Sequence, residues 1–518
     1  MKRCFPLVCL LVSVTSLAAT APGERLDVLE IRVLGNTRLP PLAIETAVYP
    51  FAGPDRTMED IEGARQALEA AYRSAGYSTV YVDIPEQKVD DGIVRLKVTE
   101  GRLERVRVEG AHYFSARRIR AALPGAAAGE VPNIPELQRD LAQLNAETAD
   151  RTIVPVLAAG ANPGTVDLTL RVEDKLPLRA SVEVNDQYTA DTSRWRASIS
   201  LGYDNLFNRF DSASFQYQTA PQERSEVDVL AGSYVTRWGR DRRNRLALTY
   251  IDSNSAVAAV GTLSVLGAGR IANAQLIFPL VNDANASHTL NVGAAYKDFS
   301  ETIRLDEDQS LATPISYVGF SVGQSSVWRV PRGEWTLASS VNFGIRGLVN
   351  DEQQFADKRY RGRPNYFYLR SEGSYRRMFG AWVEARLRGS GQYAAEPIIS
   401  NEQFALGGAS TVRGYLEASE LGDVGVGGSF EFGTQPRHLF GVKFRGEGFV
   451  FYDTGIVQAL RPLPGEERRA DLTSAGVALN LSFDSNYAAS VSWAYPLVSA
   501  GRTDAGDSRF LFMMRSSW

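Results

Sequence analysis

One arginine, in the stretch TVRGY, is the side chain with the clearest chemical use in this sequence. Arg413 follows a valine and precedes a glycine and a tyrosine. A guanidinium stays charged and offers a planar fork of donors that matches a carboxylate. An isolated arginine of this kind is most often a solvated loop residue. Its use therefore depends on the elements that surround it.

Residues with catalytic chemistry are few. The three histidines are His112, His288 and His438, and the sequence has neither an HExxH nor a GxSxG pattern. The acidic run Asp306–Asp308 lacks the spacing of a calcium-binding EF-hand loop. We therefore expect no enzyme activity such as that of a lipase or protease, no cofactor and no bound metal.

The N-terminal segment has the pattern of a secretory signal peptide. Lys2 and Arg3 precede a short apolar run, and Ser16 and Ala18 supply the small residues that a signal peptidase reads. The run is too short for a transmembrane helix. We expect residues 1–18 to be removed. Both cysteines lie within this segment, so the mature chain would have no thiol, which suits a bacterial envelope protein.

Composition excludes several classes of protein. The formal net charge of −4 gives no basic surface for nucleic acid. After the signal segment the sequence contains no apolar run of the length that a membrane-spanning helix needs. A membrane β-barrel remains possible, because its strands distribute their apolar residues by alternation.

Residues 26–174 read as one α+β unit used twice. In the first unit a strand precedes the helical stretch 57–77, where Thr57 and Asp60 form a capping-box pattern and Gly76 occupies the position of a C-terminal cap. Two strands close the unit. The second unit repeats the order of strand, helices and two strands. The apolar stripes of these helices are expected to form the domain cores.

From residue 178 onward the helical pattern is replaced by alternation with a period of two. We count about 16 such segments, an even number, as expected for a single-chain bacterial barrel. The last of them carries Phe510 and Phe512 and ends on Trp518, which resembles the signal by which outer-membrane barrels are recognised for insertion. A soluble β-sandwich or propeller is the alternative to a transmembrane barrel.

Motifs across both regions point to one family. Residues 26–101 resemble a POTRA domain of the two-partner-secretion type, and residues 102–174 resemble the second POTRA domain of the same transporters. In the barrel, residues 178–518, the stretches EQF, GG and VRGY are followed by FYDTG, as in this superfamily. The matching POTRA residues are Gly35, Asn36, Thr37, Gly76, Tyr77, Pro85, Gln87 and Gly101; those of the barrel are Val412, Arg413, Gly414, Tyr415, Phe451, Asp453 and Gly455.

The resemblance assigns a partner to Arg413. In such transporters the loop, here about residues 394–423, folds back into the lumen, and its arginine pairs with the aspartate of the strand motif. Carried over, Arg413 would pair with Asp453, and Gly414 would allow a tight turn. In a water-lined lumen such a pair would contribute ~1–3 kcal/mol, since partial desolvation offsets the attraction.

The resemblance implies an outer-membrane transporter of the TpsB type, similar to haemolysin secretion/activation proteins. Its POTRA domains would lie in the periplasm and capture a large unfolded exoprotein, an adhesin or cytolysin, by strand addition. The acceptor edge would be residues 78–85 or residues 151–158. The exoprotein would then cross the barrel. Other expected partners are outer-membrane lipid and, during biogenesis, the barrel assembly machinery.

Two rival functions share part of this pattern. A general outer-membrane insertase of the same superfamily has the same barrel and loop but usually another number of POTRA domains. A passive porin would not need periplasmic domains. Many two-partner transporters also carry an N-terminal plug helix. Here about seven residues separate the predicted cleavage site from Leu26, so we expect no plug helix and a larger sealing role for the loop.

Overall fold

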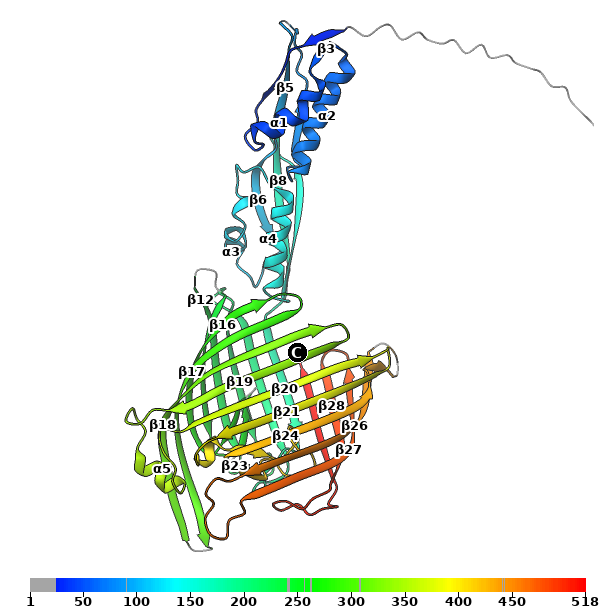
Figure 1. The fold of residues 1–518 in the computed structure, drawn as a ribbon. Coiled ribbons are helices and arrows are strands. Elements are labelled where there is room, and N and C mark those ends of the chain that lie inside the picture. The colour runs from blue at the N-terminus through cyan, green and yellow to red at the C-terminus, as the bar shows by residue number, and fades with distance from the viewer. Residues whose placement is uncertain are drawn as a thin grey trace, which may run out of the picture. The chain divides into compact units, whose positions relative to one another are not determined.

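The chain folds into two compact units, and the first ends at Leu176 while the second begins at Pro177. The computed structural model (Figure 1) describes residues 25–89, 91–239, 243–255, 257–260, 263–306, 309–439, 441 and 443–518. The segment predicted as a signal peptide lies outside the described residues. None of the described helices is long and apolar enough to cross a membrane.

The first domain of the N-terminal unit is a three-stranded sheet with two helices. Its strands follow the order β2-β5-β4, where β2 and β5 are parallel and β4 is antiparallel to β5. A second, two-stranded sheet joins β1 to β3. The elements are β1 (Leu26–Val28), β2 (Glu30–Leu34), α1 (Pro41–Val48), the 3-10 turn η1 (Tyr49–Phe51), β3 (Gly53–Arg56), α2 (Met58–Ser74), β4 (Val80–Asp83) and β5 (Ile93–Glu100).

Local sequence explains α2. The Thr57 side chain accepts from the backbone N–H of Asp60, and the Asp60 carboxylate accepts from that of Thr57, so the capping box is complete. Leu68 and Tyr72 face the sheet and are fully buried. Burial of the Tyr72 hydroxyl and the nearby Glu100 charge raise the pKa of Tyr72. Helix α1 was not predicted, because its segment lacks the polar face that marks an amphipathic helix.

The second domain repeats this plan. Its sheet has the order β6-β8-β7, again with a parallel pair and an antiparallel third strand. The two sheets therefore have the same strand order and directions, which supports an internal repeat more directly than the order of elements along the sequence. The elements are β6 (Arg102–Glu109), α3 (Ala116–Ala121), the 3-10 turn η2 (Pro124–Ala126), α4 (Ile134–Ala146), β7 (Arg151–Ala159) and β8 (Thr165–Asp174).

Backbone and side-chain contacts join the two domains. Asn133 accepts from the Glu136 N–H at the start of α4 and donates to the Ala75 carbonyl at 3.0 Å. The Ile134 N–H donates to the Gly76 carbonyl at 2.9 Å. The end of the first long helix is therefore bonded to the beginning of the second.

The C-terminal unit is a closed antiparallel barrel of sixteen strands, which confirms the fold predicted from alternation. The first and last strands close it: the Trp518 N–H donates to the Ala180 carbonyl at 2.8 Å, and the reverse bond measures 3.0 Å. The strands are β9 (Leu178–Asn185), β10 (Arg196–Leu206), β11 (Asp211–Thr219), β12 (Asp228–Trp238), β13 (Asn244–Ser253), β16 (Gly269–Asn282), β17 (Ala286–Asp306), β18 (Gln309–Val330), β19 (Gly333–Gly344), β20 (Phe367–Phe379), β21 (Val383–Ala394), β24 (Val424–Thr434), β26 (Phe444–Gln458), β27 (Arg469–Phe483), β28 (Tyr487–Pro496) and β29 (Arg509–Ser517).

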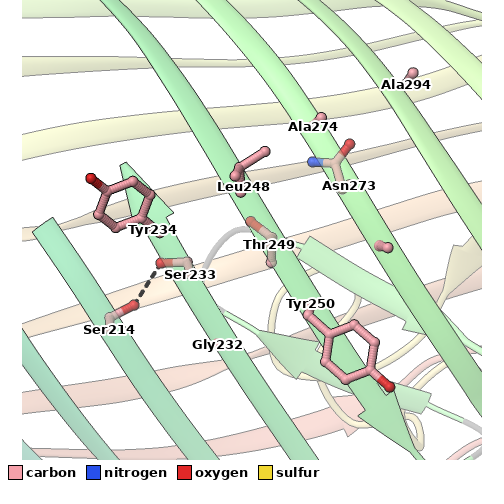
Figure 2. A pocket seen from close by; sticks show the side chains of 11 residues that line it. Ser214, Gly232, Ser233, Tyr234, Leu248, Thr249, Tyr250, Asn273, Ala274 and Ala294 are labelled. Atoms are coloured by element: carbon pink, nitrogen blue, oxygen red, sulfur yellow. Dashed lines mark hydrogen bonds between the residues drawn. The ribbon is translucent and has the colours of Figure 1, made fainter. Parts of the chain in front are cut away.

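The barrel wall has an apolar outer face and a mixed inner face. Figure 2 shows neighbouring strands of the wall, where the Ser214 and Ser233 hydroxyls hydrogen-bond between β11 and β12 at 2.8 Å. Leu248 and Tyr250, which alternate with Thr249 on β13, remain 42% and 46% exposed. Their exposure suits contact with lipid, whereas a soluble sandwich would bury one face of such strands.

We call the end of the barrel at which β9 begins the proximal end. Aromatic residues gather there, at the ends of the strands. Trp335 stacks on Tyr375 with ring centroids 3.9 Å apart, and Trp238 packs edge-on against Phe278. Such girdles mark the membrane interface of barrel proteins.

Shorter elements lie in the connections between the barrel strands. They are the hairpin β14 (Val257–Val260) with β15 (Leu263–Leu266), α5 (Glu352–Lys358), the 3-10 turn η3 (Ser400–Glu402), the hairpin β22 (Phe404–Leu406) with β23 (Glu420–Gly422), and β25 (Arg437–His438).

Candidate functional site

The connection between β21 and β24 lies inside the barrel. It leaves the wall after Ala394 and returns at Val424, and we call it the lumenal loop. Leu406 of this loop packs where Gly427 and Gly455 leave space on the inner wall, since a Cβ at Gly455 would lie 2.7 Å from its side chain. The wall glycines thus form a seat for the loop. The buried apolar residues of the loop that cluster around this seat are Phe404, Leu406, Val412 and Tyr415.

Arg413 lies at the tip of the loop and contacts Asp453 on β26. Its Nε is 2.7 Å from Asp453 Oδ2, and its second guanidinium nitrogen is 2.8 Å from Oδ1. The backbone N–H of Arg413 also donates to Oδ2 at 3.1 Å. The pair is a two-pronged ion pair with a third bond from the main chain. Asp453 is fully buried, and Arg413 is only 6% exposed.

The arginine has partners beyond Asp453. It donates to Ser429 Oγ at 3.0 Å and lies 2.9 Å from Glu431 Oε1, both on β24. Its guanidinium carbon sits 3.6 Å from the centre of the Phe451 ring. A cation over an aromatic face is favourable, and more so when water is excluded. The tip is therefore held by two strands of the wall.

Further charges extend from the tip toward the proximal end. Arg388 on β21 also binds Glu431, at 2.9 Å. Arg386, one pair closer to the proximal end, binds Glu384 and lies 2.8 Å from Glu447. Both arginines face the lumen, because they share a strand face with Glu384 and alternate with outward residues. The inner wall thus carries a chain of alternating charges.

The two residues after Arg413 fix the position of the tip. The Tyr415 hydroxyl lies 2.6 Å from the Val498 carbonyl and 2.9 Å from that of Thr473, and it accepts from the Thr473 N–H. Gly414 has a φ of +97°, and a Cβ there would lie 3.3 Å from that of Ala494. A larger residue would therefore be strained and crowded against β28.

Two buried carboxylates hold the base of the loop, and the sequence offered no role for either. Glu402 accepts from the Tyr368 hydroxyl at 2.6 Å and also from Tyr317 and Lys297. Asp423 accepts from the Ile398 N–H at 2.9 Å. Glu402 lies in the quoted EQF stretch, and Asp423 directly precedes β24, but neither position identifies its partners.

The lumen beside the loop is hollow. A cavity of about 570 Å³ separates the loop from β18 to β24 and is lined by residues such as Ser371, Gly389 and Ser429. A second cavity, of about 360 Å³, lies between Arg413 and the inner faces of β27 to β29. The loop therefore lies between two cavities of the lumen.

In the N-terminal unit the motif residues make structural contacts. The Asn36 side chain bonds both backbone groups of Leu39 at 2.9 Å and accepts from Tyr72. The Thr37 N–H donates to Glu100 at 2.6 Å. Gln87 bonds both backbone groups of Arg95, at 2.7 and 2.8 Å.

The remaining motif residues lie at turns and at the domain boundary. Gly35 follows β2, the Tyr77 N–H donates to the Tyr72 carbonyl, and Pro85 follows β4. A Cβ at Gly76 would lie 2.6 Å from the Asn133 side chain, and one at Gly101 would lie 2.4 Å from the Thr79 carbonyl. Gly76 and Gly101 thus lie where the two domains pack closely, and the other motif residues shape the turns of the first domain.

Two of the C-terminal aromatic residues, Phe510 and Phe512, lie on the last strand, β29, and Trp518 directly follows it. Phe510 and Trp518 are 63% and 59% exposed. Phe512 packs against Trp195, with ring centroids 4.9 Å apart. The strand that ends the chain thus presents aromatic side chains beside the seam of the barrel.

Comparisons with known proteins give the family. The model of the haemolysin secretion/activation protein ShlB/FhaC/HecB matches residues 164–483, and that of the ShlB-type POTRA domain matches residues 26–101. The chain is 20% identical over 464 residues to the heme/hemopexin transporter protein HuxB of Haemophilus influenzae, covering 86% of this chain and 79% of the relative.

Solved structures share the fold. CdiB from Escherichia coli superposes with a TM-score of 0.60 at 19% identity, over 98% of this chain and 93% of CdiB. BamA from Haemophilus ducreyi lacking POTRA domains 1–3 gives 0.58 at 14% identity, over 95% and 100%. The chain belongs to the haemolysin secretion/activation protein family ShlB/FhaC/HecB, outer-membrane transporters of secreted partner proteins whose POTRA domains lie in the periplasm.

Proposed function

We propose that this transporter exports one large exoprotein, an adhesin or a cytolysin, through a passage that the lumenal loop closes at rest. The observation that carries this proposal is the Arg413 tip, which lies within the lumen and is bonded to Asp453, Glu431 and Ser429. A loop bonded to the wall at its tip blocks the passage, and a loop released there leaves it open.

The direction of export follows from the connectivity. POTRA domains are periplasmic in this family, so the proximal end of the barrel, where β9 follows Pro177, faces the periplasm. The partner would enter there, meet the charges around Arg386 and Arg388, and displace the Arg413 tip. No nucleotide is available in the periplasm. Folding of the partner outside the cell is therefore the proposed driving force.

We further propose that residues 26–101 and 102–174 are both POTRA domains, and that they receive the partner by strand addition. Strands β4 and β7, the two candidate acceptors, are both edge strands. On β4, Arg65 donates to the Val82 carbonyl at 3.3 Å, and the Val80 N–H donates to the Tyr77 carbonyl. This edge is therefore largely occupied.

The outer half of β7 is the better acceptor. Asn145 bonds the N–H and the carbonyl of Ile153, so both of these groups point away from β8. Because the direction alternates along a strand, the N–H and carbonyl groups of the other odd-numbered residues of β7 also lie on its free edge. Pro155 has no N–H to offer. Leu157 and Ala159 then present their outward N–H and carbonyl groups, and Val154 and Leu157 leave apolar side chains exposed. We propose residues 156–159 as the docking edge.

Replacing Leu157 by proline is expected to lower export several-fold, because it removes an outward N–H while an edge strand tolerates the ring. Leu157→Ala keeps the N–H and removes the side chain. Export of the partner and trypsin protection of the N-terminal unit would be measured for both variants. Equal export by Leu157→Pro and wild type, with the domain intact, would exclude this edge.

The proposed function itself is tested by secretion in intact cells. Cells that lack this gene are expected to retain the large exoprotein encoded beside it, while other outer-membrane proteins stay at normal levels. The full-length gene should restore secretion, and a gene without residues 26–174 should not, at equal barrel levels. A general fall in outer-membrane proteins, with secretion unchanged, would instead support the insertase.

No catalytic role is proposed for the polar residues of this chain. His288 lies 2.9 Å from the Ser326 hydroxyl but also packs edge-on against Trp328, in the aromatic girdle of the proximal end. We assign this pair to the wall. We also propose that residues 1–18 are a signal peptide and that Phe510, Phe512 and Trp518 form the recognition signal for the barrel assembly machinery.

A further inference from the structure

The lumenal loop has a second set of anchors, which is independent of Arg413. Glu402 is buried and binds three donors on neighbouring strands: Lys297 on β17, Tyr317 on β18 and Tyr368 on β20. A buried carboxylate with several donors is costly to release, because each lost bond leaves a desolvated charge. The start of the loop is therefore fixed to the wall.

Asp423 fixes the other end of the loop. It is fully buried and accepts from the backbone N–H groups of Ile398, at 2.9 Å, and Leu460, at 2.7 Å. The Gln403 side chain donates to it at 3.2 Å, and Arg359, just after α5, lies 3.4 Å away. The Asp423 carboxylate thus joins both ends of the lumenal loop to the segment after α5 and to the loop after β26, at the end of the barrel opposite the proximal end.

Between these anchors and the tip lies the hairpin of β22 and β23. Phe404 pairs with Gly422, and Leu406 pairs with Glu420. Leu406 also fills the seat on the inner wall. A Cβ at Gly422 would lie 2.8 Å from that of Val457 on β26. The hairpin is thus packed against the same strand that carries Asp453.

The backbone changes direction where the hairpin ends. Gly407 and Gly408 have φ angles of +100° and +106°, and Ala418, on the opposite side, has +49°. The Ala418 N–H donates to the Gly407 carbonyl at 3.3 Å. Left-handed residues that face each other at the neck of a loop form a site where a few dihedral changes can reorient the segment beyond.

We propose that Glu402 and Asp423 are positioning residues that keep the base of the loop on the wall during export, so that only the tip, residues 408–418, swings away. The cavity of about 570 Å³ beside the tip supplies space for this motion. The fixed base then returns Arg413 to Asp453 after the partner has passed. This inference rests on the proposed role of the loop in closing the passage.

Two engineered disulfides separate the movements of tip and base. The chain has cysteines only at positions 4 and 9, so new pairs form without competition after the signal segment. Gly414→Cys with Ala494→Cys fastens the tip to β28, and Gly422→Cys with Val457→Cys fastens the base to β26. A Cβ at Gly414 would lie 3.3 Å from that of Ala494, and one at Gly422 would lie 2.8 Å from that of Val457 and from the Gln458 nitrogen. Both separations are below the disulfide range of about 3.5–4.5 Å, so each pair, and the base pair most, requires a shift of the backbone.

The oxidised tip variant is expected to export at least tenfold less partner than its reduced form. The oxidised base variant should export as much as its reduced form. Single-cysteine variants control for the strain at Gly414 and Gly422. If the oxidised base pair also stops export, the base must leave the wall and the inference is wrong. If the oxidised tip pair exports normally, the proposed closing role of the loop fails instead.

A second measurement needs no export. Asp423→Asn and Glu402→Gln, each placed in the tip pair, are expected to slow disulfide formation between residues 414 and 494 several-fold per assembled barrel, because a loose base misplaces the tip. A role limited to folding would lower the barrel level and leave this rate unchanged. Asp423→Glu, which keeps the charge, should recover part of the rate. An unchanged rate in both neutral variants would overturn the inference.

Discussion

Arg413→Ala is expected to leave the passage open at rest while the barrel still reaches the outer membrane. The substitution removes the side-chain bonds to Asp453, Ser429 and Glu431 and leaves Asp453 buried without its guanidinium. Removing one member of a buried ion pair costs about 3–5 kcal/mol, which corresponds to a change of at least about a hundredfold in the ratio of closed to open tip. A tip without this contact would no longer occupy its resting position.

Two measurements check this result. Purified barrels in planar bilayers should conduct more at rest, because the tip no longer fills the passage. Export of the partner should stay near the wild-type level, because export already requires the tip to leave the wall. Arg388→Ala is the matched control: it removes an arginine that also binds Glu431 but lies on the wall, at the strand β21. Wild-type resting conductance in Arg413→Ala would show that the tip contact has no part in closing the passage.

Gly407→Ala is expected to displace the whole tip and to raise the resting conductance in the same way. Gly407 has a φ of +100°, and a Cβ there would lie 2.5 Å from the Leu416 carbonyl oxygen and 3.1 Å from the Ser419 nitrogen. Both atoms belong to the backbone, so the clash is not relieved by rotating a side chain. Relief requires the neck of the loop to open, and Arg413 then loses its alignment with Asp453.

The control for Gly407→Ala separates the clash from the strain of a left-handed alanine. Gly465 has a similar φ, +91°, and a Cβ there would meet nothing within 4 Å. Gly465→Ala should therefore cost only the conformational term of about 1 kcal/mol and leave the resting conductance unchanged. The two variants would be compared for export, resting conductance and barrel level. Equal effects would mean that the crowding at the neck is unimportant.

The sequence predicted the wall of the barrel well, because each strand records its surroundings locally. A residue that faces lipid is apolar and its neighbours in the strand face the lumen, so Leu248, Thr249 and Tyr250 already show the two environments. The capping box of Thr57 and Asp60 is local in the same way. The missing prediction, α1, lies where the local pattern carries no such periodicity.

The contacts of the site also differ in whether the sequence indicated them. The motifs around Arg413 and Asp453 indicated two residues 40 positions apart, which the barrel places in contact. They gave no indication of Glu431 and Ser429 as further partners. These residues reach Arg413 because β24 pairs with β26, so that Ser429 lies directly opposite Asp453. Pairing between strands is a property of the closed sheet.

By itself, then, the sequence determined the two-part organisation, the alternating wall and the arginine that belongs in the lumen. Only the tertiary structure decided how the loop is held at its base. Lys297 meets Glu402, and Arg359 meets Asp423, across 105 and 64 residues of chain. No local spacing records such contacts, because an ion pair between distant segments depends on where the fold brings their ends and on the exclusion of water between them.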